Sequence, residues 1–141
     1  MNSTTFSDTI ATSGASLQKA SRSSRPFIAV IGSGYWGKNL VRNYHAIGAL
    51  KLICDRNVDI LSQFKAQYPD IETCLDINKC LANPEIQGVV IATPTKTHHL
   101  IAREALKYGK HVYVEKPLVQ DENDAMELIR IAEKQKMRAS A

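Results

Sequence analysis

The chain has few aromatic residues and no long apolar run. Aromatic side chains make up 6% of its 141 residues and do not alternate with basic ones, so the sequence lacks a stacking platform for nucleic acid. The net charge is only +4, and much of it lies near the two ends without forming a continuous basic stripe. No apolar stretch approaches the roughly 18 residues that span a bilayer. We therefore expect neither a nucleic-acid partner nor a membrane partner.

Cysteine and histidine are also sparse and unsuitably spaced for a disulfide framework or a metal site. Cys54, Cys74 and Cys80 are odd in number and show no C-x-x-C spacing, which favours reduced thiols in a cytoplasmic protein. His98 and His99 are adjacent, so on a helix they point about 100° apart and cannot chelate as an i, i+4 pair would. We expect no metal site.

Residues 1–25 differ in composition from the rest of the chain. They hold eleven Ser or Thr residues and little apolar periodicity, so they cannot bury enough surface to offset the entropy of ordering. We expect a disordered Ser/Thr-rich extension before one domain at 26–141, whose apolar content suffices for a core. A transit peptide is an alternative, although the Arg-rich amphipathic pattern is missing. A start codon assigned too far upstream is another.

The most informative motif is a G-x-G-x-x-G turn that follows five apolar residues. It consists of Gly32, Ser33, Gly34, Tyr35, Trp36 and Gly37, preceded by Phe27 to Ile31. Such a run is typical of a strand buried on both faces of a parallel sheet. Gly32 permits a sharp turn, Gly34 lets the backbone approach a pyrophosphate, and Gly37 lets the following helix pack against the strand.

The residues after this turn complete a dinucleotide-binding pattern. Apolar residues at helical spacing lead to Gly48, where a helix would end. A second apolar strand, Leu50 to Cys54, then stops at Asp55, 18 residues beyond Gly37. That is close to the ~20 residues at which an acidic side chain accepts hydrogen bonds from the adenosine ribose. The alternative is a tight strand-to-helix turn without a ligand, with Asp55 a solvated loop carboxylate.

The remaining sequence continues to alternate between strand and helix patterns. We expect strands at 71–75, 88–92 and 111–114, and helices that start after Asp76, near Thr97 and after Asp121, the second of them ending at Gly109. Residues expected to face the core from the last two helices are Leu100, Ile101, Ala105, Leu106, Ala125, Leu128, Ile129 and Ala132. This order predicts an α/β fold, a Rossmann-type doubly wound parallel sheet that binds its ligand at the carboxyl ends of the strands.

Two further strand ends carry residues that could contact the cofactor or take part in proton transfer. Thr93 and Pro94 follow the fourth strand, with His98 close behind, and Glu115 and Lys116 follow the fifth. A lysine beside the nicotinamide position could hydrogen-bond a substrate hydroxyl and take part in its proton transfer, so Lys116 is the catalytic candidate. The alternatives are an ordinary Glu115–Lys116 surface pair and a His98 that only caps or packs.

Together these motifs resemble the glucose–fructose oxidoreductase, inositol dehydrogenase and rhizopine catabolism (Gfo/Idh/MocA) family. The resemblance rests on the glycine fingerprint, on Ala92-Thr93-Pro94 with His98, and on Gly109 to Val112 running into Glu115-Lys116-Pro117, and it covers Pro26 to about Lys136. It implies an NAD(P)-dependent oxidoreductase acting on sugars and related alcohols. The residues implied at the cofactor are Gly32, Ser33, Gly34, Tyr35, Trp36, Gly37, Asp55, Arg56, Thr93, Pro94, His98, Glu115 and Lys116.

The cofactor and substrate implied by the resemblance can be narrowed. Asp55 favours NAD over NADP because a carboxylate repels a 2′-phosphate, although the neighbouring Arg56 could hold one if Asp55 turned away. The stretch from Gly34 to Asn43 is similar to enzymes that oxidise the 3-hydroxyl of UDP-N-acetyl-hexosaminuronic acids. Lys38 and Arg42 in this stretch could meet such a nucleotide-sugar, or could simply solvate the first helix.

The chain also departs from the family pattern. Family members carry a second α/β domain that supplies substrate contacts, a catalytic histidine and the homo-oligomer interface, and the sequence after Ala132 is too short for it. We also expect the sheet to lack its sixth strand. The short sequence fits a designed fragment, a truncated gene product or one half of a split enzyme. The alternative function for the chain is an NAD-binding module without activity of its own.

Overall fold

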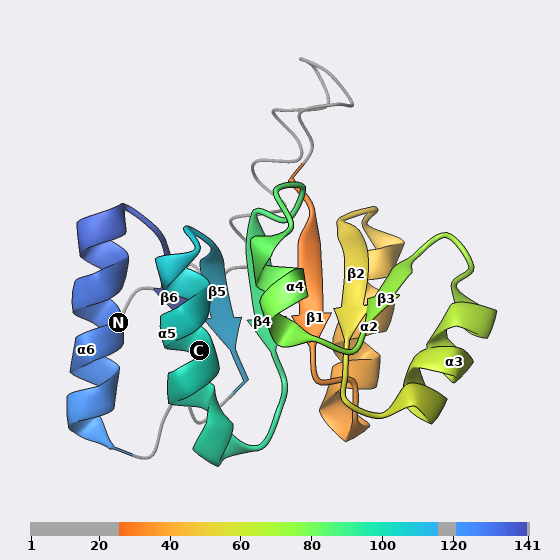
Figure 1. The fold of residues 1–141 in the computed structure, drawn as a ribbon, viewed down its shortest axis with the longest axis horizontal. Coiled ribbons are helices and arrows are strands. Elements are labelled where there is room, and N and C mark those ends of the chain that lie inside the picture. The colour runs from red at the N-terminus through yellow and green to blue at the C-terminus, as the bar shows by residue number, and fades with distance from the viewer. Residues whose placement is uncertain (1–25, 116–120, 141) are drawn as a thin grey trace.

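A six-stranded parallel sheet forms the centre of the computed structural model, which describes residues 26–115 and 121–140 (Figure 1). The strand order is β3-β2-β1-β4-β5-β6, the classic order of dinucleotide-binding sheets. The elements in chain order are β1 Ile28–Ile31, α2 Tyr35–Ala46, β2 Leu50–Cys54, α3 Val58–Gln67, β3 Glu72–Cys74, α4 Ile77–Ala82, β4 Gly88–Ile91, η2 Thr95–Thr97, α5 His98–Lys107, β5 His111–Val114, α6 Glu122–Gln135 and β6 Ala139–Ser140.

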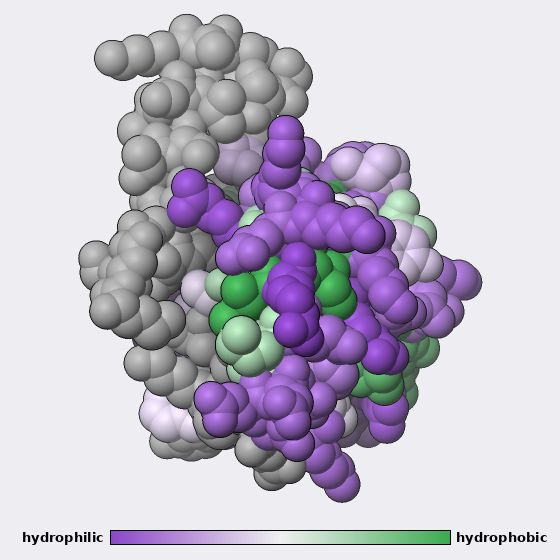
Figure 2. All heavy atoms as spheres, turned by 90° about the vertical axis from the view of Figure 1, so that its left-hand side faces the viewer, coloured by the Kyte–Doolittle hydropathy of each residue, from purple (hydrophilic) through white to green (hydrophobic). Residues whose placement is uncertain are grey.

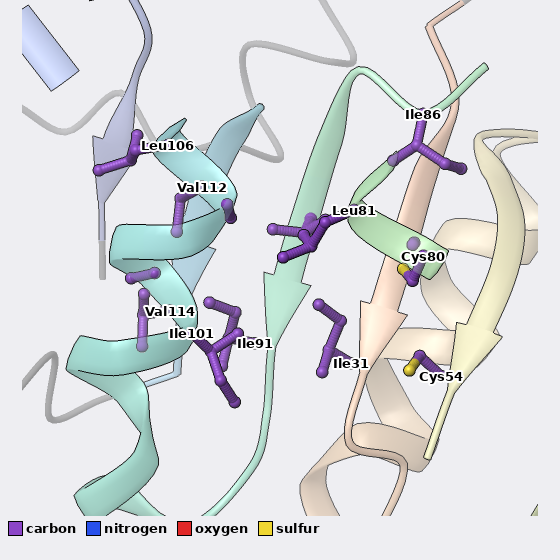
Figure 3. Packing of buried hydrophobic residues seen from close by; sticks show 14 of the residues in the cluster. Ile31, Cys54, Cys80, Leu81, Ile86, Ile91, Ile101, Leu106, Val112 and Val114 are labelled. Carbon is purple, nitrogen blue, oxygen red and sulfur yellow. The ribbon is translucent and has the colours of Figure 1, made fainter. Parts of the chain in front are cut away.

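Helices cover both faces of the sheet, because successive strand residues point to opposite sides. Ile28 and Val30 belong to the apolar cluster beneath α2 and α3, whereas Ile31 belongs to the cluster beneath α4, α5 and α6. Figure 3 shows Leu81 of α4 and Ile101 of α5 in this second cluster. The doubly wound architecture expected from the alternating pattern is confirmed, and it places the carboxyl ends of all strands along one edge.

Helix ends follow the local sequence signals. The side chains of Asn57, Asp76 and Asp121 accept hydrogen bonds from the first backbone N–H groups of α3, α4 and α6. Gly109, after the end of α5, has a φ of 76°, which lies in the left-handed region that favours glycine. The caps at Asp76 and Asp121 and the stop at Gly109 were predicted, whereas the Asn57 cap was not.

The expectation that the sixth strand is missing is wrong. Ala139 and Ser140 pair in parallel with Val112 and Tyr113 of β5, so the sheet has six strands. The chain reverses after α6 through Lys136, which adopts a left-handed φ of 57°. Sequence patterning missed this strand because a two-residue edge strand needs backbone hydrogen bonds and no apolar run. One such bond runs from the Val112 N–H to the carbonyl oxygen of Arg138 at 2.7 Å.

Two residues expected in the core lie at the surface. Leu100 of α5 is 57% exposed and Ile129 of α6 is 44% exposed. The buried stripe of α6 is narrow and is formed by Leu128 and Ala132. Ile129 follows Leu128 directly, so its side chain points about 100° away around the helix and lies outside this stripe. Figure 2 faces the α6 side and shows a small apolar area ringed by hydrophilic residues.

We predict that His111 makes the stability of this edge depend on pH. The N–H of Arg138 donates to Nδ1 of His111 at 3.1 Å, and burial and the positive Arg138 lower the pKa of His111 below its ordinary 6.5. As the pH falls below about 6.5, His111 therefore takes up a proton in the unfolded chain before it does so in the folded protein. The free energy of unfolding decreases over this range and levels off once the pH is below the pKa of His111 in the folded protein. Urea unfolding at pH 7.5 and at successively lower pH values measures this loss.

His111→Phe should reduce the acid loss of stability, because this side chain no longer titrates. His45→Asn, a change at a half-exposed histidine on α2, serves as the control and should retain the loss. An equal acid loss in the wild-type protein and in His111→Phe would show that His111 is not its source.

Candidate functional site

A cavity of about 640 Å³ lies at the carboxyl ends of β1, β2 and β4. The strand order reverses between β1 and β4, and ligands of open α/β sheets bind at such a switch point. The volume of the cavity is in the range of roughly 300–1,000 Å³ that is usual for small-molecule binding sites. The predicted residues that line it are Gly32, Gly34, Trp36, Asp55, Arg56, Thr93, Pro94, His98 and Glu115. Residues far apart in the sequence therefore meet in one place.

The three glycines of the turn meet three different steric demands. Gly32 has a φ of 85°, and a side chain there would lie 2.7 Å from Cγ2 of Thr93. A Cβ on Gly37 would collide with the carbonyl oxygen of Gly32, so this glycine lets α2 pack closely against the turn. A Cβ on Gly34 would meet nothing within 4 Å. The space beside Gly34, which lines the cavity, is thus open, as a cradle for a ligand requires.

The N-terminus of α2 lies beside this space and has no side-chain cap. Gly34 is the N-cap residue, no side chain caps the helix, and its first turn contains no acidic residue. The first N–H groups of a helix have no partner within it, and the helix dipole adds positive potential at that end. An anionic group such as a pyrophosphate fits here, because it can accept these hydrogen bonds.

Asp55 is fixed in place by three hydrogen bonds. Its Oδ2 accepts from the backbone N–H of Ser33 at 2.9 Å and from the Ser33 hydroxyl at 3.0 Å, while Oδ1 accepts from the N–H of Asn57 at 2.8 Å. A carboxylate offers about four acceptor positions, so one remains for a ligand hydroxyl. Ser33 itself is fully buried. Its backbone N–H and hydroxyl orient the carboxylate.

The loop after β4 forms the opposite wall of the cavity. The hydroxyls of Thr93 and Thr97 are 2.6 Å apart, and the Thr97 hydroxyl also donates to the carbonyl oxygen of Pro94. Nε2–H of His98 donates to the carbonyl oxygen of Thr93 at 2.7 Å, and the side chain is only 2% exposed. His98 therefore fixes the start of α5 against this loop, which agrees with the packing alternative.

Sequence reasoning missed several residues of this wall. Lys96 and Thr97 line the cavity, and their position shortly after a strand end was a signal that could have identified them. Ile77 of α4 and Ile101 of α5 contribute apolar surface. No comparable sequence signal marks Ile77, because it enters the site from a helix that follows a different strand.

The other predicted residues have different positions. Trp36 is 62% exposed at the rim of the cavity. Tyr35 begins α2, and Glu115 lies half-buried at the end of β5. Lys116, the catalytic candidate, lies outside the described residues.

Two classes of chemistry find no support in the described part of the chain. Residues 26–115 and 121–140 contain no group of three or more His, Cys, Asp or Glu side chains placed to hold a metal ion. A hydrogen bond with Cys80, together with burial, raises the pKa of the cavity-lining Cys54 thiol, which favours the neutral thiol over the nucleophilic thiolate. No helix of these residues has the length and apolar character that crossing a bilayer would require.

Comparison with known proteins identifies the family. The profile of an oxidoreductase family with an NAD-binding Rossmann fold, Gfo/Idh/MocA, matches residues 27–141. The chain belongs to this family. It is 31% identical over 109 residues to UDP-N-acetylglucosamine 3-dehydrogenase of Acidithiobacillus ferrooxidans, which covers 74% of this chain and 32% of that protein. It is 31% identical over 106 residues to inositol 2-dehydrogenase of Rhodococcus jostii, with 73% and 29% covered.

The solved structures support the same assignment. The structure of GenD2 from gentamicin A biosynthesis in complex with NAD has a TM-score of 0.77 and 26% identity, over 82% of this chain and 33% of that one. The chain thus spans about a third of the length of the relatives it matches. What it shares with them is the cofactor-binding fold of the family.

We predict that alanine substitutions separate the roles of two glycines. Gly37→Ala forces a methyl group into the Gly32 carbonyl and should lower the free energy of unfolding by about 1–3 kcal/mol, the usual cost of overpacking. Gly34→Ala places its methyl group in open space and should cost much less. Chemical denaturation of the two variants measures the difference. Equal losses would contradict the proposed division of roles.

Proposed function

We propose that the chain is the NAD-binding part of an oxidoreductase that acts on a hydroxyl group of a sugar or nucleotide-sugar. The proposal is carried by one observation: the uncapped N-terminus of α2 opens into a cavity above Gly34, with the fixed carboxylate of Asp55 beside it. A dinucleotide fits this arrangement, with its pyrophosphate at the N–H groups of α2 and its adenosine ribose at Asp55. Family membership and the NAD bound to GenD2 support the same cofactor.

The geometry of Asp55 favours NAD over NADP. Hydrogen bonds from both Ser33 donors and from the Asn57 N–H hold the carboxylate at the turn, so turning it away would cost three hydrogen bonds. A 2′-phosphate at this position would face a fixed negative charge. Arg56 lines the same cavity and is exposed, but the three hydrogen bonds keep the Asp55 carboxylate in place beside it.

We assign the catalytic role to Lys116 on the strength of the sequence motif. Bound NAD supplies the hydride acceptor. Lys116 directly follows Glu115, which lines the cavity at the end of β5, so its ammonium group would hold the substrate hydroxyl and take part in the transfer of its proton. The relative that oxidises UDP-N-acetylglucosamine supports a nucleotide-sugar as the substrate class.

A second candidate is a dinucleotide-binding module that has no activity of its own. The observation that favours it is the coverage, since the chain spans about a third of the length of its relatives. Under this alternative the chain binds NADH but turns over no substrate. The two candidates share the cofactor site and differ only in catalysis.

We predict that the chain binds NADH at least tenfold more tightly than NADPH. Trp36 is the only tryptophan and lines the cavity, so energy transfer from its fluorescence to the reduced nicotinamide reports binding at this site. Asp55→Asn removes the negative charge but keeps an acceptor for Ser33, so it should weaken the preference for NADH and strengthen NADPH binding. Calorimetry provides an independent measurement of both affinities.

The control for this experiment is Asp121→Asn, which removes a carboxylate at the start of α6 but keeps an N-cap side chain there. It should leave the preference unchanged. Absence of NADH binding at millimolar concentration would refute the cofactor site. Equal affinity for the two dinucleotides in the wild-type protein would refute the assigned role of Asp55 alone.

We predict that Lys116→Ala abolishes most turnover when the chain is supplied with a complementary C-terminal domain from a relative. Loss of a general acid or base typically costs about 10²–10⁴-fold in rate. The assay follows NAD reduction with a UDP-sugar, and NADH binding by the same variant is measured in parallel. Normal turnover with Lys116→Ala would contradict the catalytic role, and binding without turnover in every combination would favour the module.

A further inference from the structure

A second cavity, of about 590 Å³, lies between α2 and α3 on the far side of the glycine turn. Both helices cover the same face of the sheet (Figure 1). Lys38, Asn39 and Arg42 line the cavity from α2, and Gln63 and Gln67 line it from α3. The dinucleotide proposal makes no use of any of these side chains.

The charged side chains that line this cavity, among the described residues, are all positive. Lys38 and Arg42 are four residues apart, so they lie one above the other on the same side of α2, and both are exposed. Among the described residues that line the cavity there is no Asp or Glu. Within the part of the chain that the structure describes, neither cation forms an ion pair. Like charges at this spacing repel each other, and an anion between them would relieve that repulsion.

The rest of the lining is suited to a small organic anion. Gln63 and Gln67 are exposed on the opposite wall and carry neutral amide groups that donate and accept hydrogen bonds. Phe64 and the half-buried Ile60 add apolar surface at the base. A guanidinium and an ammonium group one helical turn apart can bind neighbouring oxygens of a phosphate or pyrophosphate group.

We propose that this groove between α2 and α3 is a second binding site, which takes a small phosphate-bearing ligand separate from the dinucleotide. Ser33 and Gly34 form its end and also belong to the turn at the first cavity. The two sites therefore share the backbone of the glycine turn. The site does not depend on the assignment of the dinucleotide, because its cations line only the second cavity.

Inorganic pyrophosphate is the probe for this site, and two-dimensional NMR of the ¹⁵N-labelled chain locates where it binds. The side-chain amide signals of Gln63 and Gln67 and the backbone signals of Lys38 and Arg42 should shift along one saturable curve. Because pyrophosphate also fits the N-terminus of α2, the titration is repeated with NADH present. The shifts between α2 and α3 should remain under that condition.

The matched variants test whether Lys38 and Arg42 form the site. Lys38→Gln with Arg42→Gln should weaken binding in the groove at least tenfold. Lys79→Gln with Lys134→Gln removes the same charge from exposed positions on α4 and α6 and should change it less than twofold. Shifts confined to Gly32, Thr93 and Thr97 would overturn the proposal, and so would equal weakening in both double variants.

Discussion

The hydrogen bonds between Ser33 and Asp55 are the interaction on which the candidate site depends. They join the turn after β1 to the end of β2, two segments that are 22 residues apart in the sequence. The Gly32 N–H also donates to the carbonyl oxygen of Cys54 at 2.8 Å, but only the Ser33 bonds hold the Asp55 side chain against the turn. The same bonds hold the acidic group in the position that discriminates between a ribose hydroxyl and a phosphate.

The carboxyl edge of the sheet carries charges of both signs around the first cavity. Asp55 and Glu115 supply carboxylates to the first cavity, and Arg56 and Lys96 supply cations. Among the described residues, the charged side chains that line the second cavity are the two cations Lys38 and Arg42. The first cavity therefore suits a ligand that carries both a ribose and an anionic group, and the second suits a free anion, although both sides use the same backbone.

The sequence predicts the parts of the molecule that depend on local rules. Each glycine of the turn, the carboxylate after β2 and the caps Asp76 and Asp121 could be predicted, because backbone sterics and helix capping act over a few residues. The order of the strands follows from their alternation with helices.

Features that arise from packing could not be predicted in the same way. The two-residue strand β6 is held by backbone pairing to β5, and the exposure of Leu100 and Ile129 depends on how far α5 and α6 rotate against the sheet. The groove between α2 and α3 depends on how these two successive helices, which are joined through β2, pack side by side on the sheet. Periodicity identifies an apolar face but does not fix its width to within one residue.

Amide hydrogen exchange at Ser33 tests the central claim, that the glycine turn is a preformed cradle held by Asp55. Our account predicts that the Ser33 N–H is protected in the chain without any ligand, that Asp55→Ala abolishes this protection, and that NADH shifts the Ser33 signal while β6 stays unaffected. Exchange of the Ser33 N–H at the rate of an unstructured peptide, with no response to NADH, would contradict it.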